Sequence, residues 1–328
     1  MPAFQKSIAF KIARGVRAYL NLEVGLTRRS LAEVQWRPTG SDTDGGSSGL
    51  QPENIIWIFG SGRSGSTWLS SMMEDIEGHA VWGEPWVGAL FGNYYYRAVE
   101  ELLHKDPQFI LGLHKKTWLG SIRHLVLNSA RANFPGLSGD EYLTIKEPNG
   151  SIGAPLMMEA LPESRLIFLV RDPRDVVASS MDARSEGGWN YERHIEQYLK
   201  GRSVPADKNP DAFVKKRAER YLEGMSKVKE AYDAHRGPKT VVKYEDLRSD
   251  TLGTMKKMYS TLRVEVDEEE LERVIEKHSW ENIPELEKGQ GKFYRKATPG
   301  GWSEDLTPEQ AGTVERITAP LLKEFYPG

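Results

Sequence analysis

The sequence contains no cysteine. This absence excludes disulfide bonds, thiolate metal sites and a cysteine nucleophile, and it fits a reducing compartment such as the cytoplasm. Long apolar runs are also missing, because the longest are about strand length, well short of the roughly 18 residues that a membrane-spanning helix needs. Neither charge dominates, since 44 Lys and Arg face 47 Asp and Glu, for a net charge of −3. We therefore expect no nucleic-acid partner, and any basic site must be local.

The remaining composition is that of a globular protein, with 39% hydrophobic and 28% charged residues. A length of 328 residues allows one large α/β domain or two small ones. We divide the chain into a basic amphipathic segment over residues 1–36, a flexible Gly- and Ser-containing linker over residues 37–53, and a single domain over residues 54–328.

The segment 1–36 places Ile8, Ile12, Val16 and Tyr19 at helical spacing among basic residues. Three interpretations stay open. The segment is a helix docked on the domain, a helix lying peripherally on an anionic membrane, or a targeting peptide. Secretion is not expected, because no apolar core followed by a small-residue cleavage site is present.

The strongest local pattern covers residues 55–73. Five large apolar residues, 55–59, predict a strand buried on both faces, and a Gly- and Ser-rich turn and a helix start follow. Such a strand, loop and helix hold phosphate, because backbone N–H groups converge and the helix N-terminus adds partial positive charge. Gly60 and Gly65 fit the P-loop spacing, but Ser66 replaces the lysine that binds nucleoside triphosphates. We expect a phosphate-like ligand other than ATP with magnesium.

Further short strands are predicted at residues 80–84, 142–148, 165–170 and 240–244. Strands that alternate with helices predict an α/β fold of three layers, with a central parallel sheet and helices on both faces. Ligands of such folds bind beyond the carboxyl ends of the strands. The residues that end or follow the predicted strands, and that we expect to converge on one crevice, are Arg63, Glu84, Lys146, Arg171 and Tyr244.

Two segments together resemble the sulfotransferases that use 3′-phosphoadenosine 5′-phosphosulfate (PAPS). Residues 62–69, Gly-Arg-Ser-Gly-Ser-Thr-Trp-Leu, resemble their 5′-phosphosulfate loop, and residues 171–179 resemble their 3′-phosphate motif, an arginine followed eight residues later by serine. Later segments are similar in the family's order, namely 242–247 to a tyrosine-containing segment, 278–282 to the adenine-contacting stretch and 294–302 to a late Arg-Lys-Gly loop. The resemblance covers about residues 54–305 and implies the P-loop-NTPase-like sulfotransferase fold.

The resemblance implies PAPS as donor, 3′-phosphoadenosine 5′-phosphate (PAP) as product, and no metal. The positions that match the family's donor-binding residues are Gly62, Arg63, Ser64, Gly65, Ser66, Thr67, Trp68, Arg171, Ser179, Tyr244, Ser279, Trp280, Arg295 and Lys296. Trp68 would stack on adenine, and Arg171 would pair with the 3′-phosphate, for which a guanidinium is suited. Ala297 departs from the pattern, which has glycine there, so the shape of that loop is not implied.

Sulfuryl transfer needs in-line positioning and stabilisation of charge on the leaving phosphate, and the acceptor hydroxyl needs a base. Arg63 and Lys146 match the residues that stabilise this charge in the family. Glu84 lies 21 residues after Arg63, a spacing that resembles the glutamate-base branch. Glu147 lies near the position where the small-molecule cytosolic branch carries a histidine. We prefer Glu84 as base and keep Glu147 as the alternative.

The acceptor is the least constrained part. Candidates for an aromatic acceptor wall are Trp86, Phe91, Tyr95, Trp118 and Trp189, although aromatic stripes more often belong to a core. A wall of this kind suits a small-molecule, lipid or carbohydrate hydroxyl, and less readily an amine. Arg184, His194 and Lys200 could meet an acidic acceptor, although acidic residues lie in the same region. The oligomeric state stays open.

Two other classes of function compete with a sulfotransferase. A P-loop nucleotide kinase is disfavoured by Ser66 and by the lack of an apolar strand that ends in a magnesium-binding aspartate. A non-catalytic, membrane-associated nucleotide-binding protein is suggested by the basic segment 1–36. The histidines show no supported metal-ligand spacing.

Overall fold

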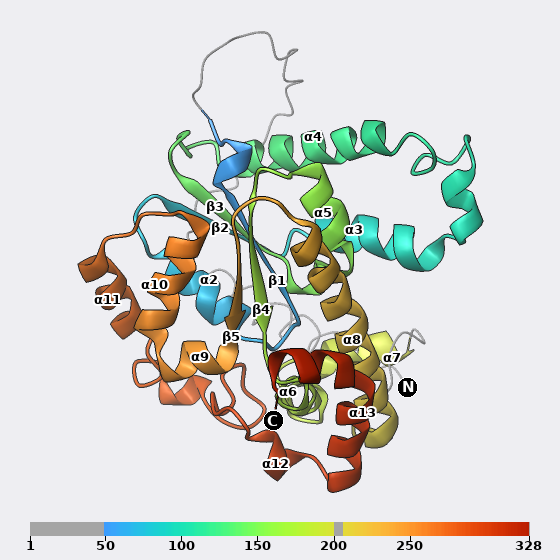
Figure 1. Cartoon of the computed structure of the whole chain (residues 1–328). Coiled ribbons are helices and arrows are strands. Elements are labelled where there is room, and N and C mark those ends of the chain that lie inside the picture. The colour runs from blue at the N-terminus through green and yellow to red at the C-terminus, as the bar shows by residue number, and fades with distance from the viewer. Residues whose placement is uncertain (1–48, 200–205, 328) are drawn as a thin grey trace, which may run out of the picture.

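The computed structural model describes residues 49–199 and 206–327 (Figure 1). The segment 1–36, most of the predicted linker and Lys200 lie outside the described residues. Within the described ranges, no helix is both long and apolar enough to cross a membrane.

Five parallel strands form one central sheet in the order β2-β3-β1-β4-β5. The strands are β1 Ile55–Gly60, β2 His79–Gly83, β3 Tyr142–Lys146, β4 Arg165–Val170 and β5 Lys239–Lys243. The predicted fold class, a central parallel sheet with helices on both faces, is confirmed. Each predicted strand is present, and the boundaries differ by one or two residues.

The helices are α2 Ser66–Glu74, α3 Val87–Asn93, α4 Lys115–Asn133, α5 Ala154–Ala160, α6 Pro173–Arg184, α7 Tyr191–Leu199, α8 Pro210–Ala234, α9 Tyr244–Ser249, α10 Thr251–Leu262, α11 Glu268–Lys277, α12 Trp302–Asp305 and α13 Pro308–Phe325. Short turns lie at Pro52–Asn54, Tyr94–Ala98, Glu101–Lys105, Pro148–Gly153 and Glu285–Glu287.

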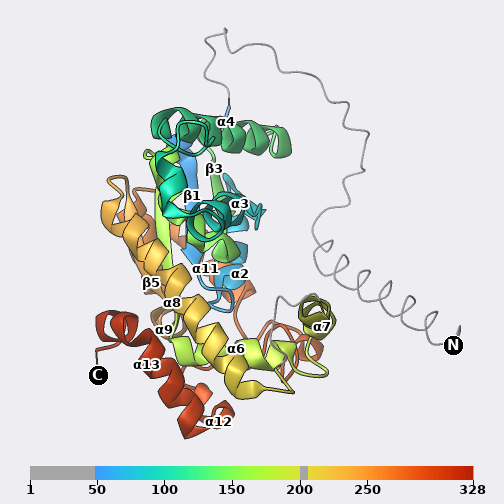
Figure 2. The ribbon, with the colours of Figure 1, turned by 90° about the vertical axis from the view of Figure 1, so that its right-hand side faces the viewer.

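The buried strand β1 divides the core in two. Its residues alternate between the faces of the sheet, so that Trp57 and Phe59 join one apolar cluster while Ile56 and Ile58 join the other. The first cluster is covered by α4, α5, α8 and α13, and the second by α2, α10 and α11. Helices α8 and α13 lie side by side (Figure 2). Burial on both faces explains why β1 reads as a continuous apolar run.

The apolar core includes one residue of the predicted linker. Leu50 lies inside the predicted linker 37–53, yet it is buried in the first cluster, and its carbonyl accepts a hydrogen bond from Arg131 at 3.5 Å. The turn Pro52–Asn54 then carries the chain directly into β1. The Gly- and Ser-containing composition led to a predicted linker that ends at residue 53, but Leu50 within it packs in the core.

The sheet topology places a crevice beside β1. The chain passes from β1 outward to β2, returns through β3, and continues on the opposite side of β1 with β4 and β5. Ligands of parallel sheets bind at such a switch point. Helix α6 starts there as predicted, since the Asp172 side chain accepts a hydrogen bond from the Arg174 N–H at 2.8 Å and Pro173 occupies the first turn.

Candidate active site

A cavity of about 1370 Å³ lies at the carboxyl ends of the strands. This is larger than the roughly 300–1,000 Å³ of typical small-molecule pockets, so it has room for two substrates. Sixteen residues of the predicted site line it, namely Gly62, Arg63, Gly65, Ser66, Thr67, Trp68, Glu84, Trp86, Lys146, Arg171, Ser179, Trp189, Tyr244, Trp280, Arg295 and Lys296. The other predicted residues, Ser64, Phe91, Tyr95, Trp118, Glu147 and Ser279, are not among the lining residues.

The phosphate loop is shaped by Gly65. Its φ of 87° is left-handed, and a Cβ there would lie 2.6 Å from the Tyr244 ring, so only glycine fits. Ser64 turns away from the cavity, because its buried hydroxyl donates to the Ser61 carbonyl at 2.5 Å and closes the turn. Helix α2 begins at Ser66, two residues before the predicted start, so its N-terminus faces the cavity.

Arg171 lies at the end of β4, between the phosphate loop and Tyr244. Its Nη1 donates to the Arg63 carbonyl at 2.9 Å, and its guanidinium covers the Tyr244 ring at 4.1 Å. Its Nε is buried and has no hydrogen-bond partner in the described part of the chain. A buried donor without an acceptor is costly, so this group suits an anionic ligand.

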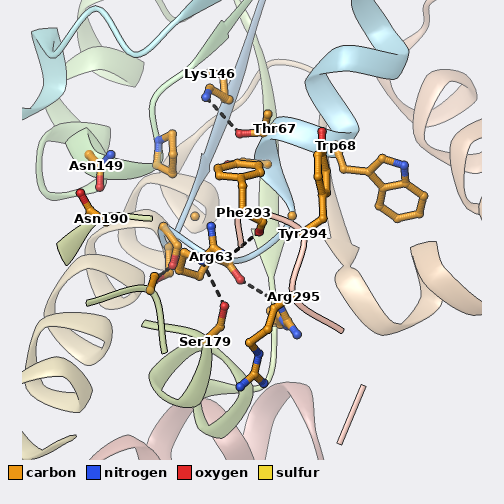
Figure 3. A pocket seen from close by; sticks show the side chains of 18 of the residues that line it. Arg63, Thr67, Trp68, Lys146, Asn149, Ser179, Asn190, Phe293, Tyr294 and Arg295 are labelled. Atoms are coloured by element: carbon orange, nitrogen blue, oxygen red, sulfur yellow. Dashed lines mark hydrogen bonds between the residues drawn. The ribbon is translucent and has the colours of Figure 1, made fainter. Parts of the chain in front are cut away.

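Arg63 crosses the centre of the cavity (Figure 3). Its Nε donates to the Ser179 hydroxyl at 3.1 Å and its Nη2 to the Phe293 carbonyl at 2.9 Å, and it lies over the rings of Phe293 and Trp189. Burial, followed by the charge of Arg171, lowers the pKa of Arg63 to about 10. Its φ of 74° is uncommon for a residue with a side chain, and such backbone strain clusters at functional sites.

Glu84 is held between two polar side chains at the opposite wall. Lys146 Nζ donates to its Oε1 at 3.1 Å, and Asn149 Nδ2 donates to its Oε2 at 2.6 Å. Lys146 also reaches the Thr67 hydroxyl at 3.4 Å, which connects Glu84 to the phosphate loop. The φ of Glu84 is 53°, again left-handed. We did not predict Asn149, although it lies just past the end of β3.

Glu147 has a different environment. Its side chain is buried, its Oε2 accepts a hydrogen bond from the Trp86 N–H at 2.9 Å, and its Oε1 has no partner among the described residues. Burial raises the pKa of Glu147 to about 8. The carboxyl therefore holds a proton near neutral pH and supports the backbone that follows Glu84.

The end of the cavity near α11 carries Trp68 and Trp280. Trp68 Nε1 donates to the His278 carbonyl at 2.8 Å, and Arg248 lies over its ring at 5.4 Å. Ser279 lies beside Trp280 but does not line the cavity. Two indole rings at this end of the cavity offer apolar surface to a flat group such as a purine.

The late basic loop is anchored by acidic residues. Arg295 pairs with Asp305 at 2.8 Å, and Lys296 pairs with Glu304 at 2.7 Å and with Asp305 at 3.1 Å. Ala297, where the family pattern has glycine, adopts a φ of 50°, the conformation that glycine favours. The loop therefore keeps its turn despite the departure from the pattern.

Only two of the five predicted wall aromatics, Trp86 and Trp189, line the cavity, and both are well exposed. Phe91, Tyr95 and Trp118 belong to or pack against the first apolar cluster. Tyr95 stacks on His104 at 4.1 Å, and Trp118 donates its indole N–H to the Gly112 carbonyl at 3.3 Å. Their stripe faces the core, because covering the sheet buries more apolar surface than lining a polar cavity.

Four lining arginines come from helices outside the sequence motifs, namely Arg184 of α6, Arg193 of α7, and Arg217 and Arg220 of α8. Of these, we predicted only Arg184. His194 is buried against Phe213 and does not line the cavity. Over residues 49–199 and 206–327, no group of three or more His, Asp or Glu side chains could hold a metal ion.

Comparisons with known proteins concern the family and the fold of the domain. The family model described as "Sulfotransferase domain" matches residues 53–326. Amine sulfotransferase of Oryctolagus cuniculus is 23% identical over 50% of this chain, and the match spans only about half, 56%, of that relative. Cytosolic sulfotransferase 12 of Arabidopsis thaliana is 25% identical, and the match covers 67% of this chain and 78% of the relative. Among solved structures, sulfotransferase STF9 from Mycobacterium avium shares the fold, with a TM-score of 0.51, 15% identity, and coverage of 84% of this chain and 78% of that chain.

Proposed function

Since the chain belongs to the sulfotransferase family, we propose that it transfers the sulfuryl group of PAPS to an acceptor hydroxyl. The observation that carries the proposal is the connection Glu84–Lys146–Thr67, which joins a cavity-lining carboxylate to a phosphate loop. A loop that lacks the P-loop lysine but has Arg63 at its centre suits a phosphosulfate better than a triphosphate.

The donor would lie along the loop. The backbone of residues 62–66 and the Ser66 and Thr67 hydroxyls would hold the 5′-phosphate, at the N-terminus of α2. Arg171, with its free Nε, and Ser179 would bind the 3′-phosphate, with Arg295 and Lys296 closing over it. Adenine would stack against Trp68 near Trp280, and Tyr244 would support Arg171 and the loop.

Glu84 would act as general base. It would take the proton of the acceptor hydroxyl, whose oxygen then forms a bond to sulfur as the bond from sulfur to the 5′-phosphate oxygen breaks. Lys146 and Arg63 would stabilise the negative charge that develops on the transferred and leaving groups. Glu147 supports this assignment indirectly, because it is buried outside the cavity and protonated near neutral pH.

The acceptor is a small molecule in this proposal. A hydroxyl needs the base that Glu84 offers, and the name of the rabbit relative, amine sulfotransferase, makes amines the second class to examine. Trp86 and Trp189 would flank the acceptor.

A labelled-donor assay tests the proposal. Purified protein is incubated with [35S]PAPS and separate phenol, aliphatic alcohol, sugar and amine acceptors, and in parallel with [γ-32P]ATP and magnesium. We expect transfer of 35S to at least one acceptor and none of 32P. Phosphate transfer alone would make the protein a kinase, and PAP binding without any transfer would make it a non-catalytic nucleotide-binding protein.

A further inference from the structure

The donor assignments leave four cavity-lining arginines unused. They come from α6, α7 and α8 and consist of Arg184, Arg193, Arg217 and Arg220. Resting on the proposed function, we propose that Arg217 and Arg184 bind an oxyanion carried by the acceptor. The acceptor class is then a hydroxy compound with a carboxylate, phosphate or sulfate group close to the hydroxyl that is sulfated.

Arg217 is held in place by neutral groups. Its Nε donates to the Ser180 hydroxyl at 2.9 Å, and its Nη2 donates to the Ser61 hydroxyl at 3.1 Å and the Gly62 carbonyl at 3.0 Å. Within the described ranges it pairs with no carboxylate, and its Nη1 makes no hydrogen bond yet is not enclosed. A fixed guanidinium whose Nη1 still has N–H groups to donate can bind an oxygen of an oxyanion.

Arg184 adds a second cation to the same region. It lies 5.9 Å from the Phe213 ring and has no ion pair or hydrogen bond with the other described residues. Burial and neighbouring arginines lower the pKa of Arg184 to about 10 and that of Arg217 to about 9. Clustered guanidinium groups repel one another, and a bound anion would relieve this repulsion.

Among the described residues that line the cavity, no carboxylate pairs with Arg217 or Arg184. The carboxylates that line the cavity are Glu74, Glu84 and Glu287. Glu84 is engaged by Lys146 and Asn149, whereas Glu74 ends α2 and Glu287 lies in the 285–287 turn. Asp182 of α6 does not line the cavity and accepts a hydrogen bond from the Gly291 N–H at 3.1 Å.

The position of Arg217 places such an anion next to the reaction. A Cβ on Gly62 would lie 3.9 Å from Arg217 Nη2 and 3.4 Å from Asn149 Oδ1. Asn149 also donates to Glu84 at 2.6 Å, so Arg217 and the side chain that holds the proposed base both lie against one glycine. An anion at Arg217 would therefore fix a hydroxyl only a few bonds away against Glu84. Trp86, with Arg193 at 5.9 Å from its ring, would cover the body of the acceptor.

Matched acceptors test the inference. We would measure KM and kcat at saturating PAPS for 2-hydroxyphenylacetate, 2-hydroxyphenyl phosphate and 2-hydroxyphenyl sulfate, each beside 2-hydroxyphenylacetate methyl ester as the neutral analogue. Binding of each compound to the protein–PAP complex is measured by calorimetry. We expect at least one charged compound to have a KM roughly ten- to a hundred-fold below that of the ester, the range for a charge-assisted hydrogen-bonded pair. The charged compound with the lowest KM identifies the oxyanion.

The variants Arg217→Gln and Arg184→Gln should bring the charged-to-neutral KM ratio toward one. Arg217→Lys, which keeps the charge, should retain part of the preference for the charged compound. It replaces Arg217→Gln in the assay if that variant does not fold. The control Arg236→Gln removes the same charge from an exposed site after α8 and should keep the wild-type ratio.

Equal KM values for charged and neutral compounds in the wild type, failure of every charged compound to bind the PAP complex, or an unchanged ratio in both Gln variants would overturn the inference. Loss of sulfuryl transfer to every acceptor, including the ester, would instead overturn the proposed function.

Discussion

Glu84 and Glu147 are two glutamates at neighbouring strand ends, and their surroundings give them opposite properties. Glu84 lines the cavity and contacts Lys146 and Asn149, whereas Glu147 is buried and receives a backbone N–H. The sequence shows two candidates for one base, and only the direction of each side chain separates them.

Glu84→Gln tests the base. The amide keeps the shape of the side chain but cannot accept a proton, so kcat should fall by about 10²-fold or more, the usual contribution of a general base. The Kd of PAP, measured by calorimetry, should stay close to the wild-type value, because Glu84 has no assigned contact with the nucleotide. A normal kcat in Glu84→Gln together with a collapsed kcat in Glu147→Gln would move the role to Glu147.

Glu147→Gln tests the buried proton. Because the pKa of Glu147 is raised from 4.5 to about 8, the folded state holds a proton that the unfolded chain releases. The free energy of unfolding then falls as pH rises from about 4.5 through about 8. Gln lacks this proton, so the difference in unfolding free energy, variant minus wild type, should increase by about 2–4 kcal/mol between pH 5 and pH 9.

Urea unfolding at pH 5, 7 and 9 measures this difference. Glu219→Gln, which changes an exposed carboxyl of α8, is the control and should show a nearly flat difference. A flat difference for Glu147→Gln as well would mean that Glu147 is ionised in the folded protein.

Cavity-lining residues could be predicted from the sequence where they lie at or just past the end of a strand. Lys146 and Arg171 end or directly follow strands, and Arg63 lies three residues past β1, so parallel strand ends bring them together. Arg217 was not predictable, because it lies inside a long helix and reaches the loop only through the packing of α8 on the sheet. Trp118 failed as a wall residue because helical spacing does not tell which face meets the core.

At the scale of elements, the phosphate loop and the β4–α6 connection carry the proposed donor site. Both follow from local rules, a glycine turn before a helix and a capped helix start after a buried strand. The segment after α11 does not, since its course depends on distant contacts such as those from Asp182 to Gly291 and from Arg63 to Phe293.

Gly65→Ala tests the loop. The left-handed φ and the Tyr244 ring leave no room for a methyl group, so the free energy of unfolding should fall by about 1–3 kcal/mol. The Kd of PAP should rise, because the N–H groups of the loop would be displaced. Gly120→Ala is the matched control, since Gly120 lies inside α4 with open space around it and should gain about 0.5–1 kcal/mol. An equally stable Gly65→Ala protein would refute the fit of loop and Tyr244.

Arg171→Ala tests the β4–α6 connection. Loss of the guanidinium should raise the Kd of PAP, which has a 3′-phosphate, by about ten- to a hundred-fold, and should raise the Kd of AMP much less. Arg174→Ala is the control, because Arg174 pairs with Asp172 and Glu315 and does not line the cavity. Calorimetry with PAP and with AMP gives the ratio of the two Kd values for each variant. Equal losses of PAP and AMP in Arg171→Ala would contradict the 3′ assignment.

At the scale of the whole molecule, the net charge does not indicate that the cavity is basic. The chain has a net charge of −3, yet nine arginines of its described part line the cavity, namely Arg63, Arg97, Arg171, Arg184, Arg193, Arg217, Arg220, Arg248 and Arg295. Composition correctly predicts that basic character must be local, but only the fold shows that it gathers on both sides of the phosphate loop.

Deletions from the N-terminus test at which residue the folded domain begins. Among the described residues the two apolar clusters start at Leu50, so we expect that deleting residues 1–36 leaves unchanged both the urea midpoint and kcat with a water-soluble acceptor. Deleting residues 1–51 also removes Leu50, whose burial stabilises the fold by about 1.5–3 kcal/mol, and the free energy of unfolding should fall by that amount. If the shorter deletion already prevents folding, the basic segment is part of the core, and the first of its three interpretations, a helix docked on the domain, is the correct one.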